Sequence, residues 1–268
     1  MIRDILLFGG QSNMQGQSEL LSESEPVPDA LEYKFLDDSL VPLRNPVGED
    51  VRYDGGRGRV FTESSDPRAW LADHVLGSSC YGHTNLVPAF ARAYLQETKR
   101  PLVAVHAAKG STEISSWLPE TDGYRALVAK AKGAIRKTVE QDGASGRIFF
   151  VWLQGESDAI AARGKEYYKD RLRLLAKGLE DDLGILRFGV IRVGAFTGDG
   201  RDAPILAAQD EICGEDPFFL MLSDRALSLS KDASMMNPAV QGHYSARGLE
   251  LLGTEAGHAL GVFAAKEV

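Results

Sequence analysis

Short apolar runs alternate along the chain with longer segments in which apolar residues recur every three to four positions. The short runs are rich in β-branched and aromatic residues and end at glycine or polar clusters, as strands buried on both faces of a parallel sheet do. They cover residues 5–8, 102–106, 148–153, 188–193 and 218–222. The periodic segments predict helices with one buried face. They cover residues 86–96, 125–139, 167–179, 204–211 and 245–263.

This alternation predicts an α/β fold in which a mainly parallel sheet lies between two helical layers. A chain of 268 residues without internal repeats suits one domain over residues 1–268. Residues 18–82 fit the pattern poorly, because they are rich in proline and glycine and carry only brief apolar segments. We expect a short strand near residues 33–36 there, and loops that shape a substrate cleft. In parallel sheets ligands bind beyond the carboxyl ends of the strands, so we expect a functional site at those ends.

Composition excludes several classes of protein. The formal net charge is −8 and no long Lys/Arg run occurs, which argues against a nucleic-acid-binding protein. No apolar run approaches the roughly 18 residues that span a bilayer. The apolar run at 5–8 is too short for a signal peptide, so we expect a cytoplasmic protein, although a processed secreted chain would look the same. Cys80 and Cys213 have no metal-ligand spacing, and we interpret them as core thiols. We therefore expect no metal and no cofactor, and the oligomeric state stays open.

The first strand exit, residues 9–16, carries a candidate nucleophile. Ser12 follows a strand and two glycines, which can expose its hydroxyl above the sheet. Its backbone N–H can then point at a developing oxyanion. The alternative is a Ser/Asn turn that caps a helix beginning near Met14.

Two further strand exits carry unusual polar groups. At residues 108–112, Gly110 allows close backbone approach to a ligand and offers an N–H to an oxyanion, although a simple turn explains the same residues. At residues 154–158, an amide and two carboxylates leave a strongly apolar strand, and burying them is costly unless they are partnered. This cluster indicates a site. For Asp158 alone, a helix N-cap is an equal alternative.

A catalytic serine needs a base, and the chain has five histidines. His106 lies on a predicted buried strand and His258 within a predicted helix, where structural roles are usual. His74 and His83 fall in the irregular region. His243 lies in a loop just before the last helix and is the best-placed base, since serine and histidine occur in several chain orders in such sites.

Four motifs now stand in order: residues 10–14 (GQSNM), 109–112 with Trp117, 154–158 (QGESD), and His243-Tyr244. Together they resemble the SGNH-hydrolase superfamily, in its sialate O-acetylesterase-like branch with the family 6 carbohydrate esterases. The resemblance spans nearly the whole chain. It implies a flavodoxin-like α/β/α fold, removal of O-acetyl groups from carbohydrates through an acetyl-enzyme, and no metal or cofactor.

The resemblance also implies roles for individual residues. Ser12 corresponds to the nucleophile and His243 to the general base. The N–H groups of Ser12 and Gly110 and the side chain of Gln154 correspond to the oxyanion donors. The residues expected to contact the substrate are Trp117, Gln11 and Asn13. Trp70 is a further candidate for stacking on a sugar, and for both tryptophans core packing is the alternative.

The chain departs from the family pattern at Val240. Many relatives carry an aspartate three residues before the histidine, and valine cannot orient an imidazole. Glu156 is the preferred substitute, Asp232 the second and Asp158 the third, while a Ser–His dyad is a further alternative. Two other functions stay open. One is an SGNH lipase or thioesterase, and the other is a catalytically silent carbohydrate-binding relative. An anionic substrate would need local arginines such as Arg57 and Arg59 to offset the net charge.

Overall fold

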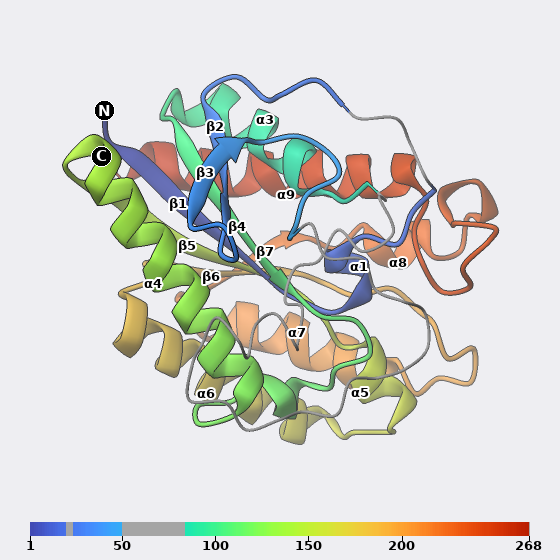
Figure 1. Cartoon of the computed structure of the whole chain (residues 1–268). Coiled ribbons are helices and arrows are strands. Elements are labelled where there is room, and N and C mark those ends of the chain that lie inside the picture. Colours follow the sequence, from blue (N-terminus) through green and yellow to red (C-terminus); the bar gives the residue numbers. More distant parts are fainter. Residues whose placement is uncertain (20–23, 50–83, 268) are drawn as a thin grey trace.

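The computed structural model describes residues 1–19, 24–49 and 84–267. These residues form one seven-stranded sheet with helices on both faces (Figure 1). The strands are β1 (Arg3–Gly10), β2 (Ala30–Lys34), β3 (Ser39–Pro42), β4 (Leu102–Ala108), β5 (Ser145–Leu153), β6 (Arg187–Ile191) and β7 (Phe219–Ser223). Their order is β3-β2-β4-β1-β5-β6-β7, and only β3 runs antiparallel to its neighbour. The predicted α/β fold with a mainly parallel sheet is confirmed.

Two helical layers enclose the sheet. The longer helices are α3 (Val87–Thr98), α4 (Asp122–Asp142), α6 (Lys165–Leu183), α7 (Ala203–Glu215) and α9 (Ala246–Lys266). Shorter ones are α1 (Ser12–Gln15), α5 (Glu156–Ile160), α8 (Ala226–Leu229), and the 3₁₀ turns η1 (Ile114–Trp117) and η2 (Ala233–Met235). Helices α3 and α9 cover one face, and α4, α6 and α7 cover the other (Figure 1). This arrangement leaves the carboxyl ends of the parallel strands free to carry a site.

The seam between α3 and α9 depends on close backbone contact. A Cβ atom on Gly257 would lie 2.2 Å from the Phe90 carbonyl oxygen, and one on Gly253 would lie 2.4 Å from the Leu86 carbonyl oxygen. No side chain fits at such distances, so glycine at these two positions lets the helices pack against each other directly. The last helix, α9, is thereby held directly against α3 on the same face of the sheet.

Most predicted elements are present with shifted ends, and the differences have physical causes. The short strand expected near 33–36 is β2, and its partner β3 was not predicted because it is a four-residue, half-buried edge strand. The four-residue spacing of apolar residues within segment 125–139 predicts Val139 on the buried face of α4, but Val139 is 41% exposed. Steps of four residues rotate by about 40° around a 3.6-residue helix, so the buried stripe instead continues to Thr138. The proposed N-cap at Asp158 is wrong, since α5 already begins at Glu156.

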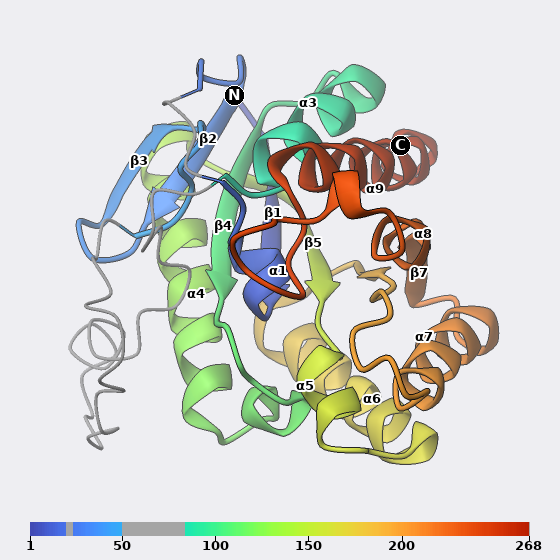
Figure 2. The ribbon, with the colours of Figure 1, turned by 90° about the vertical axis from the view of Figure 1, so that its right-hand side faces the viewer.

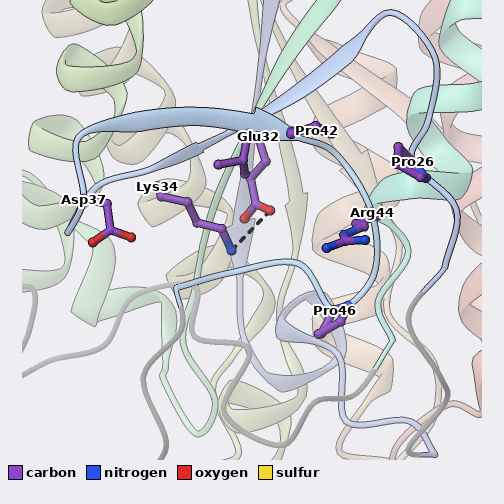
Figure 3. A pocket seen from close by; sticks show the side chains of 8 residues that line it. Pro26, Glu32, Lys34, Asp37, Pro42, Arg44 and Pro46 are labelled. Atoms are coloured by element: carbon purple, nitrogen blue, oxygen red, sulfur yellow. Dashed lines mark ion pairs between the residues drawn. The ribbon is translucent and has the colours of Figure 1, made fainter.

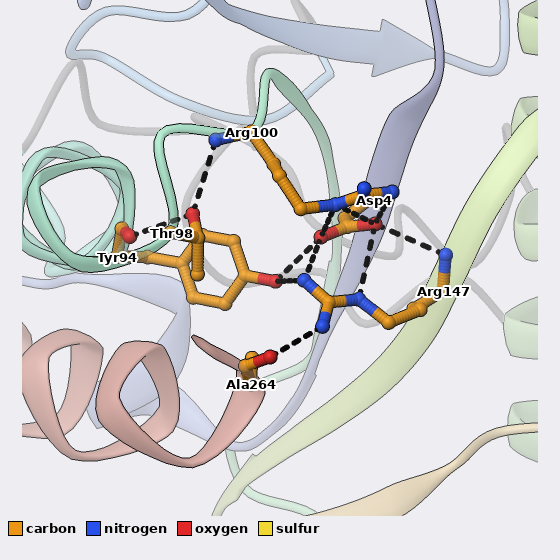
Figure 4. A network of polar contacts seen from close by, with 6 residues as sticks. All are labelled: Asp4, Tyr94, Thr98, Arg100, Arg147 and Ala264. Atoms are coloured by element: carbon orange, nitrogen blue, oxygen red, sulfur yellow. Dashed lines mark hydrogen bonds and ion pairs between the residues drawn. The ribbon is translucent and has the colours of Figure 1, made fainter. Parts of the chain in front are cut away.

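A buried charge cluster closes the amino-terminal edge of the sheet (Figure 4). Asp4, on β1, is fully buried and accepts hydrogen bonds from Arg100, Arg147 and Tyr94. Arg147, on β5, also donates to the carbonyl oxygen of Ala264 near the end of α9. Burial alone would raise the pKa of Asp4, but the hydrogen bonds from Arg147, Arg100 and Tyr94 outweigh it and hold the pKa below its ordinary value. Asp4 is therefore a fully paired structural anchor of this edge.

Candidate active site

Ser12 lies at the carboxyl end of β1, where the chain turns sharply into α1. Gly10 has φ of 141°, and a Cβ there would lie 2.1 Å from the Leu153 carbonyl oxygen on β5. That geometry requires glycine. The turn places α1 between the ends of β4 and β5 (Figure 2). Ser12 is the first residue of α1 and is 8% exposed. Its backbone N–H thus belongs to the free N-terminal turn of a helix.

Gly110 lies next to Ser12, as the motifs predicted. A Cβ built on Gly110 would be 3.4 Å from the Cβ of Ser12, because β1 and β4 are adjacent and in register at their ends. The Gly110 N–H donates a hydrogen bond of 2.9 Å to Oε1 of Gln15, three residues after Ser12 on α1. The proposed oxyanion donor therefore already has an acceptor.

His243 is held by the backbone of its own loop. Its Nδ1 lies 2.9 Å from the carbonyl oxygen of Gln241. A carbonyl oxygen can only accept, so Nδ1 carries the proton and Nε2 carries the lone pair. Nε2 is buried and has no hydrogen-bond partner among the described residues. Burial also lowers the pKa of His243 below its ordinary value, which favours the neutral imidazole that a general base requires.

Asn13 connects the Ser12 turn to the His243 loop. Its Nδ2 donates to the Gly242 carbonyl oxygen at 3.3 Å, and its Oδ1 accepts from the Tyr244 N–H at 3.3 Å. These contacts flank His243 on both sides. The same Nδ2 lies 2.8 Å from Oε1 of Glu156. Asn13 was predicted to contact substrate, but it is 2% exposed and its amide is engaged within the protein.

Glu156 begins α5 and is buried beside this arrangement. Burial raises its pKa to about 7, against the hydrogen bond from Asn13, which lowers it. Its second oxygen, Oε2, is buried without a hydrogen-bond partner in the described part of the chain. Glu156 contacts Asn13, and Asn13 contacts both neighbours of His243. The carboxylate is thus linked to the histidine through an intervening amide.

The two other candidate carboxylates bind elsewhere. Asp158 accepts from Nε2 of Gln154 at 2.6 Å and from the Ile114 N–H at 2.9 Å. Asp232 is exposed and caps η2, because its carboxylate accepts hydrogen bonds from the N–H and the hydroxyl of Ser234. The position that an orienting acid takes on Nδ1 is occupied here by the Gln241 carbonyl oxygen.

Gln154 is a buried connection point rather than an open donor in this structure. It is fully buried, and its Nε2 lies within hydrogen-bond distance of the Thr112 carbonyl oxygen (2.9 Å), Asp158 (2.6 Å) and Oε1 of Gln11 (3.2 Å). A primary amide has two hydrogens, so both are engaged. Gln11, another expected substrate contact, also accepts from the Ser157 N–H. These bonds tie the exits of β1 and β5 together.

Trp117 packs in the core. It is 0% exposed, donates from Nε1 to the Thr112 hydroxyl at 3.0 Å and meets Trp152 edge to face at 5.7 Å. The core-packing alternative therefore describes Trp117 in this structure, because a fully covered ring has no face for a sugar. Other expectations lie outside the described residues, namely those for Arg57, Arg59, Trp70, His74, Cys80 and His83.

The described part of the chain holds a second, polar pocket but no cluster suited to a metal ion. Its described residues contain no group of three His, Cys, Asp or Glu side chains placed to hold a metal ion. None of its described helices is long and apolar enough to cross a membrane. A separate pocket of about 410 Å³ lies where β2, β3 and residues 44–46 meet (Figure 3). There Lys34 lies 3.4 Å from Glu32, whose pKa is raised to about 7 by burial.

Two contacts of the candidate site were not predicted from the sequence. One is the Gln15 oxygen on the Gly110 N–H, and the other is the Gln241 carbonyl on His243. Gln15 stands three residues after Ser12, so helical spacing was an available signal for a side chain near the nucleophile. A backbone carbonyl carries no signal in the sequence at all.

The fold and the placement of these side chains point to a class of protein, the α/β ester hydrolases. A serine on the first strand exit and a histidine near the end of the chain lie at the carboxyl edge of a parallel sheet, with backbone N–H groups beside the serine. The chain belongs to the family described as carbohydrate esterase, sialic acid-specific acetylesterase, whose model matches residues 2–260. It is thus a carboxylic ester hydrolase for carbohydrate O-acetyl groups, and the resemblance inferred from the motifs is confirmed.

Solved structures share the fold at low sequence identity. A protein from Arabidopsis thaliana is 17% identical, with a TM-score of 0.69 over 100% of this chain and 99% of its own. NanS is 13% identical, with a TM-score of 0.60 over 99% and 98%. A carbohydrate acetylesterase from Xanthomonas citri is 15% identical, with a TM-score of 0.53 over 96% of this chain and 56% of its own. The comparison with curated proteins found no match.

Proposed function

We propose that the esterase works through a Ser12–His243 dyad in which the Gln241 carbonyl replaces the orienting acid. The observation that carries this proposal is the state of His243. Its Nδ1–H is bound to a carbonyl oxygen and its buried Nε2 is left without a partner among the described residues. A buried acceptor without a donor is costly, and such groups concentrate where a protein keeps an atom for chemistry. The Val240 position then needs no aspartate.

The reaction follows from these atoms. Nε2 of His243 takes the Ser12 proton as Oγ attacks the acetyl carbonyl carbon, and the Gln241 carbonyl steadies the imidazolium through Nδ1–H. The N–H groups of Ser12 and Gly110 hold the oxyanion. The sugar hydroxyl leaves with the proton from His243, and water then hydrolyses the acetyl-enzyme by the same steps. Gln154 becomes a third donor only if one amide hydrogen leaves its present acceptor.

Glu156 acts in this proposal as a positioning residue. By accepting from Nδ2 of Asn13 it fixes which end of the Asn13 amide faces the Tyr244 N–H. Asn13 in turn holds the backbone on both sides of His243. The glutamate thereby supports the histidine without touching its ring, which differs from the direct contact expected of a triad acid.

The substrate is an acetyl ester of a carbohydrate, and the net charge of the protein bears on which class of sugar carries the acetyl group. A formal net charge of −8 gives no long-range attraction for an anionic sugar. We therefore propose neutral acetylated saccharides as substrates on equal footing with O-acetylated sialic acid.

The test is hydrolysis of p-nitrophenyl acetate and of both sugar classes by the wild type, Ser12→Ala and His243→Ala, with Ser39→Ala on the edge strand β3 as the matched control. Loss of turnover in the first two variants, with Ser39→Ala unchanged, supports the dyad. Wild-type rates in Ser12→Ala would overturn it. A wild type that binds acetylated sugar but hydrolyses none of the esters would identify a silent binding relative.

A further inference from the structure

The oxyanion donor at Gly110 is occupied by a side chain from the helix that carries the nucleophile. Oε1 of Gln15 accepts the Gly110 N–H at 2.9 Å, and Gln15 is only 9% exposed. We propose that Gln15 plugs the oxyanion hole of the resting enzyme and withdraws as the oxyanion forms, so that this exchange adds to the acylation barrier. The inference rests on the proposed function, in which Gly110 is an oxyanion donor.

The positions of the atoms around Gly110 support the exchange. A Cβ atom built on Gly110 would lie 3.3 Å from Oε1 of Gln15 and 3.4 Å from the Cβ of Ser12. The amide oxygen and the nucleophile therefore lie on the same side of Gly110, where a substrate carbonyl would have to enter. A backbone N–H has one hydrogen, so Gln15 and the substrate compete for it.

The chemistry of the plug explains why it can be displaced. An amide oxygen is a neutral acceptor, as an ester carbonyl is, and it satisfies a donor that would otherwise be left partly buried and unpaired. An oxyanion makes a charge-assisted hydrogen bond that is roughly twice as strong as a neutral one. The ground-state carbonyl therefore displaces Gln15 poorly and the oxyanion displaces it well. The plug thus raises the barrier between the bound ester and the transition state by about the free energy of one neutral hydrogen bond.

The experiment replaces Gln15 with residues of similar shape that either lack the acceptor oxygen or carry a stronger one. Gln15→Met is nearly isosteric and lacks the carbonyl oxygen. Gln15→Glu, measured at pH 8, supplies an anionic acceptor. Gln17→Met is the control, because Nε2 of Gln17 also lies 3.5 Å from the built Cβ of Gly110. Each variant is compared in the pre-steady-state burst with p-nitrophenyl acetate.

A second readout is the rate of phosphonylation by a p-nitrophenyl phosphonate. In that reaction an Oγ–P bond forms, the P–O bond to nitrophenolate breaks, and His243 passes the serine proton to solvent. A merely structural glutamine would slow both reactions when replaced. The plug predicts that Gln15→Met accelerates both by about 2- to 10-fold, the range expected for losing one neutral hydrogen bond. Gln15→Glu slows both, and Gln17→Met leaves both unchanged.

The inference is overturned if Gln15→Met is no faster than the wild type or if Gln15→Glu is faster. Should the methionine variant fail to fold in a thermal melt, Gln15→Ala replaces it with the same expected acceleration. The Ser12→Ala variant distinguishes a failure of the plug from a failure of the proposed function. If it is inactive while the Gln15 variants match the wild type, only the plug is wrong. If Ser12→Ala stays active, the proposed function itself has failed.

Discussion

Two clusters at opposite edges of one sheet treat buried polar atoms in opposite ways. At the amino-terminal edge, Asp4 is surrounded by Arg100, Arg147 and Tyr94, and both of its oxygens are bonded (Figure 4). At the carboxyl edge of the same strands, Nε2 of His243 and Oε2 of Glu156 are buried with no partner in the described residues. Pairing stabilises a fold, whereas an unpaired buried atom costs stability and is retained where it does chemistry. The difference assigns anchoring to the Asp4 cluster and supports the proposal that the reaction takes place at the other edge.

The largest effect is expected on kcat, from substitutions at the carboxyl edge that leave the Asp4 cluster intact. Ser12→Ala and His243→Ala should each lower kcat by about 10⁴-fold or more, because the two groups act as one unit. For the same reason, the double variant should be no worse than either single one. Steady-state kinetics on an acetylated saccharide measure this. The free energy of urea unfolding should stay within about 0.5 kcal/mol of the wild type, and a large loss there would erase the contrast between the edges.

The next largest effect is expected on stability, from a substitution in the Asp4 cluster that leaves the carboxyl edge intact. Asp4→Asn removes the charge that pairs with Arg100 and Arg147, and should lower the free energy of unfolding by about 3 kcal/mol at pH 7. Because the pKa of Asp4 is lowered in the folded state, this contribution exists at neutral pH and disappears as pH falls through that lowered pKa. Urea unfolding at pH 7 and at pH 3 measures it. The folded variant should keep its kcat within about twofold, and a larger drop would tie Asp4 to the site.

A smaller effect shows that the reactive edge costs stability. The folded-state pKa of Glu156 is raised to about 7, so its protonated form favours folding below pH 4.5 and this advantage is lost as pH rises through 7. Glu156→Gln cannot titrate. From pH 5 to pH 8 the wild type should therefore lose about 2 kcal/mol of unfolding free energy relative to the variant. Parallel unfolding series at the two pH values test this, and identical slopes would contradict the assignment.

The smallest expected effect ranks the candidate acids by activity. Glu156→Gln should lower kcat by about 10-fold, since a glutamine can donate as well as accept and no longer fixes the Asn13 amide. Asp232→Asn should change kcat by less than about twofold, because asparagine caps a helix turn as well as aspartate does. If Glu156→Gln lowers kcat but leaves KM unchanged, Glu156 positions the catalytic histidine and does not bind the substrate. The reverse ranking would make Asp232 the group that acts on His243.

The strands and helices were predictable because their signals are local. The apolar runs and the 3.6-residue periodicity record which faces are buried, and these account for β1, β4, β5, β6 and β7 and for the long helices. The edge strand β3 and the short α5 and α8 carry too few residues for such a signal. Val139 was misplaced because a spacing of four drifts around the helix, a detail that the packing of α4 on the sheet decides.

The site divides in the same way. The sequence by itself determined the family motifs, the proximity of Ser12 to Gly110 through adjacent strand ends, and a late histidine before the last helix. Only the tertiary structure decided where hydrogen bonds go. It placed the Gln241 carbonyl on His243, the Gln15 oxygen on Gly110, the Asn13 amide between Glu156 and the histidine loop, and Trp117 in the core. The physical reason is that residue types state which donors and acceptors exist, whereas pairing depends on distances between segments far apart in the chain.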